Sequence, residues 1–453
     1  MKKISNLNRT KHGAASVFLA IIMAALILVE CTFLAFVWNL DRAMAVNTAL
    51  KTEIDTILSD YNRQLYSVYG VYAFTMEGVD DECFSKALEI NGLTADSELF
   101  VSGRKRFKAE DLKKAINSFY WYRGTGIALK TVAQNYSEMV RELDKTGIIN
   151  KAGKFMQSPA AGYLAKIIGG TESAEEWIKK AGDTLNIDDL AKEAADMDAI
   201  SKDYKNAIKD FGIDINLNIE NFEALLKTMS KLEKTFSLLT DNSDAAFTKF
   251  SVSHYCAYNF DCHCRPKGDT SINGADFKAI HGKSKADSEY IITGMDQVPS
   301  VLEIEYFMYH VLLISCILND YINEKFRNTM EVLGQVISAI ILAVSEGSVD
   351  IDPRLIAAAL TFCCAAFQTI PLFIKLTHGE RAVLLKYEDE KLITFNYRDI
   401  LYLAALCAPT DTLLERMTKV LERDYGKLYK GIKIETDFRG STYSLEKSYS
   451  LYG

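Results

Sequence analysis

The sequence contains few residues of the kinds that form stalks, disulfide scaffolds or nucleic-acid surfaces. Only 6 of the 453 residues are proline and no low-complexity tract occurs, which excludes a Pro-rich or Ser-rich linker. The 9 cysteines are scattered and too few for a disulfide scaffold in a chain of this length. Lysine and arginine (52) are fewer than aspartate and glutamate (60). The net charge of -8 argues against a nucleic-acid partner, which requires a basic surface.

The motifs of the common enzyme classes are also missing from the sequence. It has no HExxH of zinc proteases, no GxSxG nucleophile elbow, no Walker phosphate loop and no GxGxxG dinucleotide fingerprint. We therefore expect a protein that is not an enzyme and that carries no cofactor. Hydrophobic residues (49%) and charged residues (25%) occur in the proportions of a folded globular chain.

One long apolar segment, residues 14–38, dominates the N-terminal part of the chain. As a helix it is about 37 Å long, enough to cross a hydrocarbon core of about 30 Å. Residues 1–13 carry four basic side chains, whereas those after the segment are mixed with acids. The bias of lysine and arginine predicts a cytoplasmic N-terminus. We expect a single-pass cell-membrane protein whose bulk is extracytoplasmic, with the lipid bilayer as one partner.

Two features of this segment leave alternatives open. Residues 43–45 (Ala-Met-Ala) have the small-x-small form that signal peptidase cuts, but the apolar run exceeds the about 7–15 residues of a cleavable signal. An uncleaved anchor is therefore favoured over cleavage after Ala45. Glu30 is a carboxylate within the span, where charge is costly, so it is a candidate contact for another membrane subunit. A tolerated acid close to the outer headgroups is the competing interpretation.

Beyond the span the pattern predicts an α+β protein that is predominantly helical. Residues 39–68 continue as an amphipathic stem helix, with apolar side chains every three or four positions. Residues 69–250 form a mixed and then helical region, with strands at 69–74 and 98–107 and helices at 116–123, 127–143, 187–211 and 219–239. Residues 301–453 form an apolar helical region, with helices at 304–319, 329–344, 353–376, 397–408 and 411–425 and a strand at 432–438.

Residues 355–374 carry no charge over a length that suits a second membrane span. Gln368 and Pro371 interrupt this segment, and charged residues bound it closely. A buried core helix is favoured here, with a membrane hairpin as the alternative.

The segment from 251 to 300 is predicted to be an irregular loop region containing cysteines and histidines. Thiolates and imidazoles are natural zinc ligands. The candidate metal ligands are Cys256, Cys262, Cys264, His254 and His263. Their spacing is poor for zinc, because structural sites bring two separated ligand pairs and no second pair follows. We expect no metal site, and a disulfide within the triplet and inert thiols are the other interpretations.

Several segments together resemble the TadE/TadG-like proteins of Gram-positive bacteria. They are the basic segment followed by Gly13 and ASVFLAII, then DYNRQLYSVYGVYAF, INSFYWYRG, residues 288–294 (SEYIITG), residues 396–401 (NYRDIL) and the strand at 432–438. Such proteins accompany tight-adherence (Flp-type) pilus genes and form a domain family of unknown function. The resemblance implies a surface-exposed assembly or minor pilin-like subunit of such a pilus or of a related secretion apparatus, with other pilus or secretion subunits as partners.

The sequence departs from the pilin pattern at one position. Pilin precursors are cut after a glycine and carry glutamate at the fifth position of the mature chain. Gly13 is the possible processing site here, but Phe18 stands at that fifth position. The alternative function is an exported metal- or redox-binding sensor or enzyme that uses residues 254–264.

Overall fold

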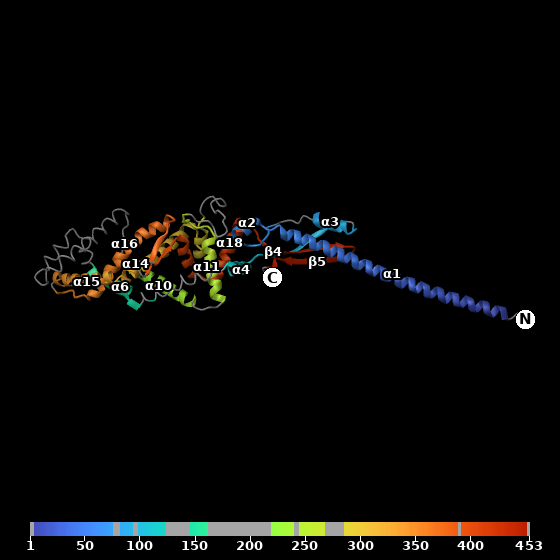
Figure 1. The fold of residues 1–453 in the computed structure, drawn as a ribbon, viewed down its shortest axis with the longest axis horizontal. Helices are drawn as coiled ribbons and strands as arrows, with labels where there is room; N and C mark the ends of the chain where they lie inside the picture. The colour runs from blue at the N-terminus through green and yellow to red at the C-terminus, as the bar shows by residue number, and fades with distance from the viewer. Residues whose placement is uncertain are drawn as a thin grey trace. The chain divides into compact units, whose positions relative to one another are not determined.

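The structure is a computed structural model that describes residues 4–75, 82–93, 98–123, 141, 145–161, 219–239, 244–267, 285–345, 347–387 and 391–450. Helices predominate in these residues and the strands are few and antiparallel, so the predicted α+β class is confirmed (Figure 1). The chain forms two compact units. Unit 1 comprises Met1–Tyr66, Gly70–Phe107 and Glu422–Gly453, and unit 2 comprises Ser67–Tyr69 and Lys108–Leu421.

Unit 1 begins with α1 (Ile4–Ser59), one continuous helix of 56 residues (Figure 1). Its second half packs into the core of unit 1 through side chains spaced three or four apart, among them Val46, Leu50, Ile54 and Ile57. This spacing places them on one helix face, as the amphipathic stem pattern predicts. The stem helix is shorter than predicted, because α1 ends at Ser59 rather than near residue 68.

A second helix, α2 (Arg63–Tyr69), starts after a break in the backbone. The Asn62 side chain accepts a hydrogen bond from the Leu65 backbone N–H at 2.9 Å, which is the N-cap interaction that asparagine favours. The predicted strand at 69–74 is therefore wrong for most of its length. Tyr69 ends α2, and Phe74 alone forms an isolated bridge with Tyr429.

The sheet of unit 1 joins segments from both ends of the chain. Its strands β1 (Leu99–Arg106), β4 (Tyr429–Phe438) and β5 (Ser441–Ser448) pair antiparallel in the order β1-β4-β5. Ile432, Ile434 and Phe438 of β4 join the core that α1 and α3 (Glu82–Ile90) also enter. Strand β5 follows the predicted strand at 432–438 and was not itself predicted. Arg439 and Gly440 both have positive φ and form the two-residue turn that connects β4 with β5.

Unit 2 is a helical assembly with one small hairpin (Figure 1). Its described elements are α4 (Ala109–Arg123), α6 (Ile148–Met156), α10 (Ile219–Leu239), α11 (Asp244–Asn259), α13 (Asp287–Thr293), α14 (Gln297–Ile322), α15 (Glu324–Val344), α16 (Pro353–Thr377), β2 (Ala382–Tyr387), β3 (Lys391–Phe395), α17 (Tyr397–Leu406) and most of α18 (Thr410–Tyr425). The described helices at 109–123, 219–239, 297–322, 324–344, 353–377, 397–406 and 410–425 overlap the segments predicted to be helical. The predicted helices at 127–143, apart from residue 141, and at 187–211 lie outside the described residues.

The main core of unit 2 surrounds α14. Residues 310–318 of this helix are all buried, and the cluster around them includes side chains from α11, α16 and α17. Among the described residues, three helices are long and apolar enough to cross a membrane, namely α1, α14 and α16. The apolar window of α1 is 0% buried, whereas those of α14 and α16 are each 61% buried inside the protein. This burial favours a core helix over a membrane hairpin at 355–374.

The prediction of an irregular region at 251–300 is wrong for much of its described length. Residues 251–259 complete α11, and α13 and the start of α14 follow at 287–293 and 297–300. Helix α11 is buried on several sides, so its polar and apolar residues do not segregate into the stripe by which an amphipathic helix is recognised. The division of the chain also differs from the predicted regions, because residues 422–450 belong to unit 1 and residues 108–250 belong to unit 2.

Candidate functional site

The apolar half of α1 is the first candidate site. Phe18, Leu28 and Leu34 are each 66% exposed, as expected of a surface that lipid would cover. The Arg42 guanidinium lies 3.8 Å from the centroid of the Trp38 ring. A tryptophan beside an arginine is typical of a membrane–water boundary, so this pair is suited to one end of a membrane span. Gly13 and Glu30 both lie within α1, and Glu30 is exposed on its surface.

The candidate metal ligands are distributed over α11 and the segment that follows it. His254 is stacked on Tyr258, with ring centroids 4.3 Å apart, and its Nδ1 lies 2.7 Å from the Tyr120 hydroxyl oxygen. The Cys262 thiol donates a hydrogen bond to the Cys264 carbonyl oxygen at 3.4 Å. No group of three or more His, Cys, Asp or Glu suited to a metal ion occurs in the described part of the chain.

The thiols of this segment form no disulfide, and burial keeps those of Cys256 and Cys264 protonated. All 9 cysteines are present as free thiols, so no disulfide joins the triplet. Burial raises the pKa of the Cys264 thiol to about 12 and that of Cys256 still further. Because the thiolate is both the metal ligand and the nucleophile, thiols that stay protonated at neutral pH are poor at either task.

These residues instead border a buried polar cluster, which we define as Asp261, Glu289, Tyr397, Arg398 and Asp399. Arg398 on α17 is only 1% exposed. Its Nη1 donates hydrogen bonds to the carbonyl oxygens of Ala257 at 2.5 Å and Phe260 at 2.9 Å, at the end of α11. The last carbonyls of a helix lack partners within the helix and carry partial negative charge, so a cation is favourable there.

Glu289 links two further segments of the buried polar cluster. Its Oε1 accepts hydrogen bonds from the His263 backbone N–H at 2.8 Å and from the Tyr397 hydroxyl at 2.9 Å. Burial raises the pKa of Glu289 to about 7, and these hydrogen bonds and the Arg398 charge offset part of that effect. The carboxyl group therefore changes charge close to neutral pH.

Asp261 fixes the chain beyond α11. It accepts two hydrogen bonds from the Arg265 guanidinium, at 2.8 and 2.9 Å, and one from the Lys285 backbone N–H at 2.9 Å. Asp399 accepts one from the Tyr258 hydroxyl at 2.5 Å and completes a capping box with Asn396 at the start of α17. The buried polar cluster thus joins segments from three separate parts of the sequence. Two of them, residues 288–294 and 396–401, are segments on which the family resemblance rests.

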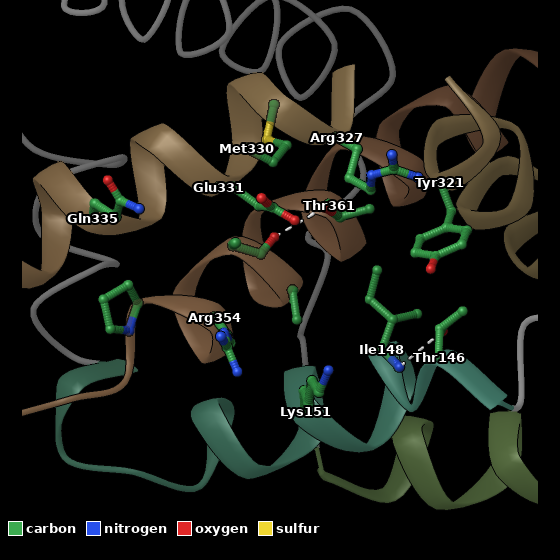
Figure 2. Close-up of a pocket in the computed structure, with 13 residues that line it drawn as sticks. Thr146, Ile148, Lys151, Tyr321, Arg327, Met330, Glu331, Gln335, Arg354 and Thr361 are labelled. Carbon is green, nitrogen blue, oxygen red and sulfur yellow. Dashed lines mark hydrogen bonds between the residues drawn. The ribbon is translucent and has the colours of Figure 1, made fainter. Parts of the chain in front are cut away.

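A pocket of about 500 Å³ lies elsewhere in unit 2, between α6, α14, α15 and α16 (Figure 2). We call it the basic pocket, and its lining residues are Thr146, Ile148, Lys151, Tyr321, Arg327, Met330, Glu331, Gln335, Pro353, Arg354, Ala357, Ala358 and Thr361. A Cβ atom at Gly334 would lie 2.5 Å from the Pro353 carbonyl oxygen, so glycine there allows α15 to approach α16 beside the pocket. Sequence analysis missed this pocket, because its residues come from separate helices and share no local pattern.

Searches against protein-family models, curated proteins and solved structures found no match to this chain.

Proposed function

We propose that this protein is a non-enzymatic, membrane-anchored subunit exposed on the cell surface, and that it serves the assembly of a tight-adherence pilus or a related secretion apparatus. The observation that carries the proposal is the continuity of α1, which runs unbroken from an exposed apolar segment into the core of unit 1. The resemblance of several sequence segments to TadE/TadG-like proteins supplies the pilus assignment. The bilayer and other pilus or secretion subunits are the proposed partners.

The length of α1 supports a rigid attachment to the membrane. A helix of 56 residues is about 84 Å long, of which the bilayer needs about 30 Å for its hydrocarbon core. The remainder includes the part that contributes Val46, Leu50 and Ile54 to the core of unit 1. Such an anchor holds unit 1 close to the bilayer surface, as suits a subunit that contacts other membrane components.

The orientation follows from the charges at the two ends of the span. Basic residues before the apolar segment favour a cytoplasmic N-terminus, and Trp38 with Arg42 suits the outer boundary. Sequencing the N-terminus of the mature protein tests the anchor directly. Met1 is expected for a permanent anchor, and Ala14 would add pilin-type processing after Gly13 while keeping the span. Val46 would contradict the anchor, because it shows removal of the whole segment.

Gene deletion tests the assembly role. We expect the deletion strain to lose surface pili, adhesion or secretion by the apparatus. Expression of the wild-type chain should restore the lost function. A chain in which polyleucine replaces residues 14–38 keeps the anchor and removes Glu30, while Glu30→Gln alone removes the charge. Failure of both variants to restore function would place a partner contact at Glu30. Unchanged pili, adhesion and secretion in the deletion strain would refute the proposal.

A further inference from the structure

The basic pocket concentrates positive charge in a protein whose net charge is -8. Lys151 on α6, Arg327 on α15 and Arg354 on α16 all line it, and Glu331 on α15 supplies the one carboxylate among its described lining residues. Figure 2 shows Arg354 and Lys151 below Glu331 in this view, with Arg327 and Tyr321 to its right. Three cations from three different helices therefore surround one hollow.

The three cationic side chains of the basic pocket form no close ion pair with the described residues. Among the described residues, neither Lys151 nor Arg354 has an ion-pair partner, and both side chains are exposed. Arg327 approaches Glu324 at 3.9 Å, the outer limit for an ion pair, and its guanidinium lies 5.5 Å from the centroid of the Tyr321 ring. These cations can therefore contact a ligand without first breaking a strong internal ion pair.

The two threonine hydroxyl groups of the pocket already form hydrogen bonds within the protein, and other uncharged lining residues are apolar. The Thr361 hydroxyl donates to the Ala357 carbonyl oxygen at 2.9 Å, and the Thr146 hydroxyl oxygen accepts from the Ile148 backbone N–H at 3.2 Å. Met330 and Ala358 add apolar surface. Recognition of a polar ligand therefore depends mainly on the charged side chains.

We propose that the basic pocket binds a small organic phosphate, with Lys151, Arg327 and Arg354 on the phosphate and Glu331 on a hydroxyl or amino group of the same ligand. Guanidinium and ammonium groups are the side chains that hold phosphate oxygens by charge-assisted hydrogen bonds. A volume of about 500 Å³ lies in the range of small-molecule sites, which leaves room beyond the phosphate itself. The proposal is independent of the pilus role, because it rests on unit 2 alone.

The phosphate group has two possible sources, a free metabolite and a lipid headgroup. The test therefore uses the full chain in an uncharged detergent, with glycerol 3-phosphate as the soluble probe. In a second arm the chain is placed in nanodiscs of phosphatidylcholine, with or without phosphatidylglycerol. Isothermal titration is expected to show one saturable site for glycerol 3-phosphate that weakens as NaCl is raised. A loss of that binding in the phosphatidylglycerol nanodiscs would identify the headgroup as a competing occupant of the same pocket.

Matched variants separate the pocket from general surface charge. Lys151→Gln and Arg354→Gln should each weaken binding about tenfold, as loss of a charge-assisted hydrogen bond does. Lys325→Gln removes an exposed charge from α15 that does not line the pocket, and it should leave the affinity unchanged. Glu331→Gln should alter the preference between glycerol 3-phosphate and inorganic phosphate, because only the former carries hydroxyls.

The absence of saturable binding both in detergent and in nanodiscs of phosphatidylcholine alone would overturn the proposal. So would equal weakening by Lys325→Gln and Lys151→Gln, which would show that diffuse charge attracts the ligand. All these substitutions lie on exposed side chains, so the variants are expected to fold, and unchanged thermal unfolding verifies this.

Discussion

The substitution Glu289→Gln measures what it costs to hold a carboxylate in the buried polar cluster. The pKa of Glu289 is raised by burial from its ordinary 4.5 to about 7. Between these two pH values the folded protein binds more protons than the unfolded chain, so this group lowers the free energy of unfolding as the pH rises. Each pH unit of the window contributes about 1.4 kcal/mol, which gives about 3 kcal/mol over the whole window.

Glutamine keeps the shape of the side chain and its acceptor oxygen. The hydrogen bonds from the His263 backbone N–H and the Tyr397 hydroxyl can therefore remain, while the proton equilibrium is removed. Relative to the wild type, Glu289→Gln should gain stability steadily as the pH rises from 4.5 to 7, by about 3 kcal/mol in total. Taking the difference between the two proteins cancels the titration of groups that they share.

Urea unfolding of the full chain in uncharged detergent, followed by near-ultraviolet circular dichroism at several pH values, gives the required free energies. Glu415 is exposed on α18, so Glu415→Gln serves as the matched control for a Glu→Gln substitution outside the cluster. A difference between Glu289→Gln and wild type that stays constant from pH 4.5 to 7 would refute the reasoning. It would mean that the carboxyl group is solvated and that the cluster does not close around it.

Three other substitutions test the remaining contacts. His254→Asn should show the opposite dependence on pH. Burial lowers the pKa of His254 to about 4, so the free energy of unfolding of the wild type falls by up to about 3 kcal/mol as the pH falls from 6.5 to 4. The variant should avoid that loss in the same urea experiment. Arg398→Met leaves the carbonyl oxygens of Ala257 and Phe260 without their donor, and should lower the free energy of unfolding by about 3 kcal/mol. Leu50→Ala in the core of unit 1 should cost about 3 kcal/mol, whereas Leu34→Ala on the exposed apolar face of α1 should leave urea unfolding unchanged.

Periodicity was sufficient to predict helices with one clear apolar face or a long apolar run. The predicted helix at 219–239 has the bounds of α10, and α14, α15 and α16 begin within a few residues of prediction or extend beyond it. Helix α11 was not predicted, because it is buried on several sides and carries histidine, tyrosine and cysteine in place of an aliphatic stripe. Strand β5 was not predicted, because it is a polar edge strand. The Arg439-Gly440 turn before it was a usable signal.

The candidate sites were less predictable than the helices. Glu30 and Gly13 were named from a long apolar run, which is a local property of the sequence, and their roles stay predictions. The buried polar cluster is different, because Tyr397, Arg398 and Asp399 lie more than a hundred residues after Asp261 and Glu289 along the chain. Two charged residues directly before an apolar run, Arg398 and Asp399 before ILYLAAL, were the available signal. The histidines and cysteines of 254–264 drew attention for their metal chemistry, whereas the structure uses the backbone and Asp261 of this segment for hydrogen bonding.

The strand pairing of unit 1 defines how the anchor and the helical part of the chain are related in sequence. Arg106 at the end of β1 lies opposite Tyr429 at the start of β4. The long segment Lys108–Leu421 of unit 2 is inserted between Phe107 and Glu422 of unit 1, and unit 2 also includes Ser67–Tyr69. The stem of α1 needs Ile432 and Ile434 to cover its apolar face, and these residues lie near the end of the chain. Unit 1 can become complete only after the segment containing β4 has been synthesised, so the core contacts between α1 and β4 form after residues 108–421 have been made.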